Sequence, residues 1–301
     1  MRKNIVILIV IVPVFLFALL GAFARIMLMF DHNEHMYLGA ALLSRQGNAQ
    51  YRDFAYLQMP YLPLIYRAVY TIFQVHSSYL LVGKIASFMF TALSALAIFF
   101  IAWRTLRDLV SGLATATLFL MNITILGPAA EVSNYIAPVA FSLVSCALFL
   151  WALDRERPRT FGCVLAGIML ALAIGTKLTY ATAALPFCAV ALFPARVRRI
   201  FPPFALGLAL GLLPIVLYLA DFDRFLFNNL TYHAINTQWR LQTGHNEPMT
   251  LAAKLPDVRD LFLRFDTLLV LAASAFGALL AIARAARCGR APRWRAGAVL
   301  A

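Results

Sequence analysis

Long apolar runs alternate with short polar segments along almost the whole chain. A helix needs about 20 apolar residues to cross a ~30 Å hydrocarbon layer, and eight runs approach or exceed that length: residues 5–30, 79–103, 110–126, 136–153, 161–176, 178–194, 200–220 and 266–283. The run from Pro60 to Val75 is too short and contains two prolines and Arg67, which suits a helix lying in the membrane interface. The pattern predicts an all-α integral membrane protein with about eight transmembrane helices.

Composition supports this class and excludes a water-soluble globule. The chain is 62% apolar and only 13% charged, with a mean hydropathy of +0.80. Such a chain has too little polar surface to cover a globule of 301 residues. Most of it must therefore face lipid or other buried helices.

Basic residues lie mostly in alternate loops, which predicts the orientation in the membrane. Fifteen Lys and Arg residues fall in the short segments around residues 2–3, 104–107, 155–159, 196–199 and 284–295, whereas only eight fall in residues 31–78, 127–135 and 221–265. Cytoplasmic loops carry the excess of Lys and Arg. We therefore expect a multi-pass protein of the plasma (inner) membrane with both termini in the cytoplasm. This placement accounts for the net charge of +13, so no nucleic-acid partner is expected.

Both ends of the chain need a separate interpretation. The first run could be a secretory signal peptide, but it exceeds the usual apolar core of such peptides, so a retained helix is favoured. Residues 284–301 are expected to form a basic cytoplasmic tail that contacts anionic membrane lipids, and residues 1–283 are expected to form one membrane domain.

Acidic residues show the opposite bias, because ten of the thirteen fall in or beside the segments expected outside. Acids contribute little to orientation, so chemistry or ligand binding on the outer face is a plausible cause. The sequence Asp31-His32-Asn33-Glu34-His35 follows the first run directly. Carboxyl groups beside apolar walls have raised pKa values that suit a general base. The alternatives are that these residues simply end the helix in the headgroup region, or that His32, Glu34 and His35 bind a metal.

Other polar residues of the outer segments also allow two interpretations. The segment from Met36 to Gly47 is consistent with a short amphipathic helix ended by glycine. Lys84 and Lys177 lie at expected membrane edges, where a lysine either extends to water or pairs with a phosphate or an acid. Side chains of the last outer segment offer rings and donors for a sugar, or form an ordinary interfacial aromatic belt: Tyr232, His233, Trp239 and Arg240.

An ordered set of residues resembles the first outer loop of the C-type membrane glycosyltransferases. The set is Glu34, Tyr37, Ala40, Gly47, Tyr51, Asp53, Phe54, Pro60 and Lys84, and the later Gly167, Gly175-Thr176-Lys177 and Pro186 extend it. The likeness covers roughly residues 28–220 and is greatest to the branch of protein O-mannosyltransferases and the bacterial aminoarabinose transferase of lipid A. Two positions depart from the family pattern: Asn33 replaces the first residue of an Asp-Glu pair, and Met59 replaces a phosphate-contacting lysine.

The resemblance implies an enzyme that moves a sugar from a polyprenyl-phosphate carrier to a hydroxyl on the outer membrane face, with inversion. Asp31 or Glu34 would be the catalytic base, and Arg52, Lys84 or Lys177 would bind the donor phosphate. Asp53 would join the four residues of the last outer segment in contacting sugar or acceptor. The acceptor would be a lipid, a glycan or a protein.

Three points stay open at this level. A lipid-linked sugar flippase, or a non-catalytic membrane subunit, is the alternative function. No cofactor is predicted, although a divalent metal is compatible with the pattern. The family is usually longer, so the chain reads either as a fragment or as a reduced member.

Overall fold

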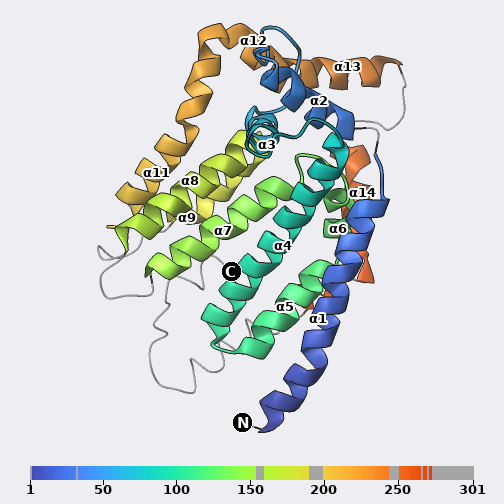
Figure 1. Ribbon diagram of the computed structural model, residues 1–301, viewed down its shortest axis with the longest axis vertical. Helices are drawn as coiled ribbons and strands as arrows, with labels where there is room; N and C mark the ends of the chain where they lie inside the picture. The colour runs from blue at the N-terminus through green and yellow to red at the C-terminus, as the bar shows by residue number, and fades with distance from the viewer. Residues whose placement is uncertain are drawn as a thin grey trace.

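The computed structural model describes residues 2–31, 33–153, 159–189, 199–243, 251–265, 267–269 and 271–272. These residues form helices joined by turns, with no strand among them (Figure 1). The all-α class predicted from the sequence is confirmed for this part of the chain.

Six helices make up the main bundle: α1 (Arg2–Leu28), α4 (Tyr79–Leu106), α5 (Leu109–Met121), α7 (Ile136–Leu153), α8 (Thr160–Thr176) and α11 (Phe201–Val216). They pack in a row in which α11 contacts α8, α8 contacts α7, α7 contacts α4, and α4 and α1 both contact α5 (Figure 1). Sequence neighbours therefore pack against each other along most of the row.

Shorter helices lie between these six in the chain or follow the last of them. On one end lie α2 (Glu34–Arg45), α3 (Tyr61–Ile72), α12 (Phe222–Leu226), the π-helical turn η4 (Phe227–Thr231) and α13 (Tyr232–Thr243). Figure 1 shows α2, α3, α12 and α13 gathered at the upper end of the bundle, where α1 ends and α4 begins. The remaining elements are α6 (Ile123–Ala129), η1 (Leu178–Ala183), α9 (Ala184–Ala189), η3 (Leu217–Asp221) and α14 (Leu251–Leu263).

The expectation of eight spans is not confirmed. Four helical stretches are long and apolar enough to cross a membrane: Ile9–Leu28, Tyr79–Leu106, Ile136–Leu153 and Phe201–Thr243. Helices α5 and α6 make a fifth if the bent pair is counted as one span. The runs expected at 161–176 and 178–194 form shorter apolar helices as far as they are described. Most of the run at 266–283, and the tail at 284–301, lie outside the described residues.

Asn122 breaks the span that was expected to run from 110 to 126. Its backbone is extended, and its side-chain oxygen accepts a hydrogen bond from the amide of Ile125 at 3.2 Å. Asparagine competes with the helical backbone in this way and caps a new helix. Helices α5 and α6 therefore meet at an angle of 61°.

The two short helices expected in the first outer loop are present as α2 and α3. Helix α2 is followed by Gly47 at a φ of +95°, a conformation that glycine adopts without strain. Its apolar face packs on α3, whose buried side chains include Leu62, Tyr66 and Tyr70. Arg45, in the last turn of α2, donates a hydrogen bond to the carbonyl oxygen of Val75 after α3. Residues 31–78, the segment predicted as the first outer loop, thus include a packed layer of two helices on the end of the bundle.

Candidate active site

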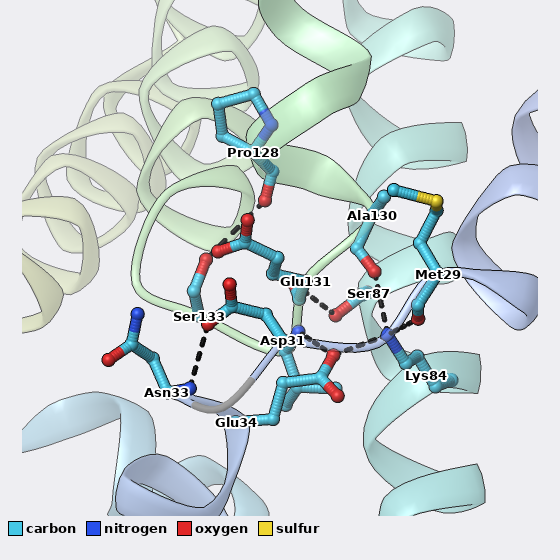
Figure 2. A network of polar contacts seen from close by, with 11 residues as sticks. Met29, Asp31, Asn33, Glu34, Lys84, Ser87, Pro128, Ala130, Glu131 and Ser133 are labelled. Carbon is cyan, nitrogen blue, oxygen red and sulfur yellow. Dashed lines mark hydrogen bonds and ion pairs between the residues drawn. The ribbon is translucent and has the colours of Figure 1, made fainter.

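A buried ion pair lies where the first outer loop meets the bundle. Lys84, in the second turn of α4, is 2% exposed, and Glu34, the first residue of α2, is 4% exposed. The ammonium group of Lys84 donates to Oε1 of Glu34, and also to the carbonyl oxygens of Met29 at 2.5 Å and Ala130 at 2.7 Å (Figure 2). Of the partners considered for Lys84 in the sequence, the one found in the structure is an acid, Glu34.

The segment that joins α6 to α7 closes this arrangement from the other side. The amide of Val132 donates to Oε1 of Glu34 at 2.8 Å. Ser87, one helical turn after Lys84 on α4, donates to the carbonyl oxygen of Glu131 at 3.5 Å. The ion pair thus joins the end of α1, the start of α2, helix α4 and the segment 130–132.

Asp31 lies beside the pair and is half-buried. Its Oδ1 accepts a hydrogen bond from the amide of Asn33 at 2.7 Å, which holds the turn between α1 and α2. Figure 2 shows the carboxyl groups of Asp31 and Glu131 pointing to the same side, towards Ser133.

Glu131 is the residue that sequence reasoning missed. It entered the sequence analysis only as one of ten acids expected on the outer side. The available signal was its position in the short polar segment from Glu131 to Asn134, between two apolar runs. No motif connected that segment to the first outer loop.

A buried polar chain continues from this site along the underside of α2. The hydroxyl of Tyr37 donates to Oδ1 of Asn134 at 3.1 Å, and the amide of Asn134 donates to Oε1 of Gln58 at 2.8 Å. Burial raises the pKa of Tyr37 to about 12, so this phenol stays protonated and acts as a donor. The carbonyl oxygen of Gln58 accepts a further hydrogen bond from Tyr51 at 2.6 Å.

Lys177 lies at the other side of the same polar segment. It directly follows α8, and its ammonium group lies 3.8 Å from the ring centroid of Tyr135. That distance is within the range of a cation–π contact. Among the described residues Lys177 forms no salt bridge, in contrast to Lys84.

Arg52 and Asp53 form a separate, exposed pair on the first outer loop. The guanidinium of Arg52 contacts both carboxylate oxygens of Asp53, at 2.9 and 3.1 Å. The hydrogen bond from Arg52, together with one from the amide of Ala49, lowers the pKa of Asp53 to about 2. Asp53 is therefore a permanent anion rather than a proton acceptor near neutral pH.

The start of α13 packs on the loop between α2 and α3. Nε2 of His233 donates to the carbonyl oxygen of Leu57 at 2.9 Å, and the Tyr232 ring packs edge-on against His233. Trp239 and Arg240 lie further along α13 and are exposed. The structure thus brings His233 to the first outer loop and leaves Trp239 and Arg240 on the surface.

An apolar groove of about 360 Å³ lies between α8, α11 and α12, beside the first outer loop. Met59 lines it from the loop, next to Gln58 of the polar chain. The other lining residues are almost all aliphatic or aromatic, with Asn229 as the polar exception: Ile174, Leu178, Leu212, Ile215, Val216, Leu219, Phe225, Leu226, Asn229 and Leu230.

The structure gives no support for a metal site within the part of the chain that it describes. No group of three or more His, Cys, Asp or Glu side chains there gathers closely enough to hold an ion. His32, which the sequence analysis considered with Glu34 and His35, lies outside the described residues.

In a comparison with known protein families, the model of glycosyltransferase family 87 matches residues 63–301. No curated protein and no solved structure matches the chain. The match begins within α3 and includes Lys84, Glu131, Lys177 and all of α13. Asp31, Glu34, Arg52 and Asp53 precede it.

Proposed function

The chain belongs to glycosyltransferase family 87, and we propose that it transfers a sugar from a polyprenyl-phosphate carrier to an acceptor hydroxyl at the outer face of the plasma (inner) membrane. Membership supports a membrane glycosyltransferase, with a sugar donor and an acceptor. The narrower likeness to protein O-mannosyltransferases and the aminoarabinose transferase remains a proposal.

The observation that carries the donor proposal is the apolar groove beside a polar loop. A polyprenyl phosphate has a long hydrocarbon chain and an anionic head, so it needs an apolar surface that adjoins cations and hydrogen-bond donors. The groove supplies the first, because its lining is almost wholly apolar. Met59 is part of that lining. The aminoarabinose transferase branch has a phosphate-contacting lysine at the matching position, whereas Met59 contributes an apolar side chain to the groove.

Lys177 is the cation best placed for the donor phosphate. It stands in sequence between Ile174 and Leu178, which both line the groove, and its ammonium lies over Tyr135 beside the polar chain. A preorganised ammonium in a water-poor site stabilises the charge that develops on a leaving phosphate. Arg52 remains a second candidate, although Asp53 already neutralises its charge.

The proposed reaction is a single displacement. A carboxylate of the first outer loop, Asp31 or Glu34, takes the proton of the acceptor hydroxyl as its oxygen bonds to the anomeric carbon. The bond between that carbon and the phosphate oxygen breaks, and polyprenyl phosphate leaves with the electron pair. One displacement from the opposite face inverts the anomeric configuration.

The first test measures transfer from a panel of polyprenyl-phosphate sugars to lipid, glycan and protein acceptors in purified membranes. Transfer with an inverted product supports the proposal. Movement of the lipid-linked sugar across the membrane without transfer would instead favour the flippase, and binding without either would favour a non-catalytic subunit.

Replacement of Lys177 tests the phosphate site. We expect Lys177→Gln to raise the KM for the donor about tenfold or more, because a charge-assisted contact to phosphate is lost. Lys254→Gln in α14 is the matched control, since it removes the same charge from a residue outside the groove lining. An unchanged donor KM in Lys177→Gln would exclude Lys177 from the phosphate site.

A further inference from the structure

All three hydrogen-bond donors of the Lys84 ammonium are already used. A lysine has three N–H groups and no acceptor, and here the three acceptors are the Glu34 carboxylate and the carbonyl oxygens of Met29 and Ala130. With 2% of Lys84 exposed, a phosphate would have to displace one of these partners. Lys84 is thus poorly suited to bind the donor.

Two short segments are held on both sides by this one ion pair. In the first, the carbonyl of Met29 and the side chain of Glu34 both bind the Lys84 ammonium, with Asp31 between them in the chain. In the second, the carbonyl of Ala130 binds Lys84 and the amide of Val132 binds Glu34, with Glu131 between them. Figure 2 shows that the two carboxyl groups so held point to the same side.

We propose that Glu34 and Lys84 are positioning residues, which fix the segments that carry Asp31 and Glu131, and that Asp31 is the base. This inference rests on the proposed sugar transfer. Glu34 Oε1 is occupied by Lys84 and by Val132, and Glu34 is 4% exposed. Asp31 is half-buried, and its carboxylate is held by the hydrogen bond from the amide of Asn33. Asp31 therefore combines access to a substrate with a fixed position.

The charge balance between Glu34 and Lys84 allows their positioning role to be tested. Removing one partner of a buried ion pair leaves an uncompensated charge, whereas replacing both partners by neutral groups of similar size is tolerated far better. Glu34→Gln alone and Lys84→Gln alone should therefore lower the melting temperature and the transfer rate together. The double variant Glu34→Gln/Lys84→Gln keeps a neutral hydrogen-bonding pair and should recover both.

The experiment compares the two single variants, the double variant and Asp31→Asn in the full-length protein. We expect the double variant to keep at least about a tenth of the wild-type kcat, with a donor KM within about threefold and the same acidic limb in its pH profile. Asp31→Asn should fall by about 10²–10⁴-fold in kcat, the usual contribution of a general base. Its melting temperature should match the wild type, because asparagine still accepts the hydrogen bond from Asn33.

Several results would overturn the inference. A stable double variant that has lost kcat and the acidic limb would make Glu34 the base. A stable double variant with a donor KM raised tenfold or more would make Lys84 a phosphate ligand. Asp31→Asn with kcat within tenfold of wild type would remove Asp31 from the base role, whether or not the double variant folds. Absence of transfer by the wild-type protein would instead refute the proposed function itself.

Discussion

Three carboxyl groups of the first outer loop differ mainly in what surrounds them. Glu34 is buried against an ammonium, Asp53 is exposed beside a guanidinium, and Asp31 is half-buried in a turn. Asp53 has a pKa of about 2, caused first by its hydrogen bond from Arg52. Since a depressed pKa means that the charged form is favoured, Asp53 loses its charge only as the pH falls towards 2.

Asp53→Asn should therefore leave the pH dependence of kcat unchanged between about pH 5 and 9. The wild-type carboxylate is fully ionised throughout that range, so its removal takes away no titrating group. Transfer rates across the range would check this, with Asp31→Asn for comparison. An acidic limb that moves by more than about half a pH unit in Asp53→Asn would assign that limb to Asp53.

At this scale the sequence predicts which residue types matter but not how they pair. Glu34 and Lys84 were both selected, yet they are 50 positions apart, and no periodicity reveals that one ammonium binds three segments. Glu131 was overlooked because the segment that carries it is held by side chains that are distant in sequence, Lys84 and Glu34. The exposure of Trp239 and Arg240 could not be predicted from the sequence either. It results from the length of α13 beyond His233, the residue that contacts the loop between α2 and α3.

Individual helices were more predictable than their junctions. An amphipathic pattern predicted α2, and Gly47 marked its end. A short apolar run with two prolines and Arg67 predicted α3. Local sequence largely decides such features. Hydropathy did not predict the break at Asn122, since one capping residue hardly changes an apolar average. Hydropathy also did not predict which helices pack together. Helices α8 and α11, for example, approach closely at Gly167, where a Cβ atom would lie 2.1 Å from the carbonyl oxygen of Phe204.

The contact of α3 with α8 gives a prediction about elements. A Cβ atom on Gly175 would lie 2.2 Å from the ring of Tyr61, whose hydroxyl donates to the carbonyl oxygen of Gly211 at 2.6 Å. Gly175→Ala should therefore displace Tyr61 and destabilise the protein by about 1–3 kcal/mol, the usual cost of overpacking. Thermal unfolding in detergent would measure the loss.

Gly39→Ala is the matched control for that variant. Gly39 lies within α2, and a Cβ atom there would meet nothing within 4 Å. Alanine in a helix interior is favoured over glycine by about 0.5–1 kcal/mol, so this variant should be unchanged or slightly more stable. Equal losses in the two variants would contradict the close packing of Tyr61 against α8.

For the whole molecule, composition was enough to predict the class, while the number of spans was not. Long continuous apolar runs favour helices in a membrane, because a helix satisfies its backbone hydrogen-bonding groups within one segment. Helix length then decides which helices can cross the membrane, and α8, with 17 residues, is shorter than the ~20 residues that usually do so. The continuous helical stretch Phe201–Thr243 turned out longer than the run expected at 200–220.

The sidedness of the molecule is still a prediction and can be tested directly. In a background with Cys146, Cys163, Cys188 and Cys288 replaced by serine, Asp53→Cys should react with a membrane-impermeant maleimide added to intact spheroplasts. Arg107→Cys, between α4 and α5, should react only after permeabilisation, because the excess of Lys and Arg predicts that side as cytoplasmic. The reverse pattern would place the buried ion pair on the cytoplasmic side.

The position of the apolar groove bears on how quickly such an enzyme meets its donor. Its wall includes Leu212, Ile215 and Val216 of α11. The neighbouring side chains of Leu213 on α11 and Leu217 at the start of η3 are 59% and 79% exposed. A donor dissolved in the bilayer would then arrive by diffusion in two dimensions. Turnover would follow the mole fraction of donor among the lipids, so adding inert phospholipid at constant total donor should slow the reaction.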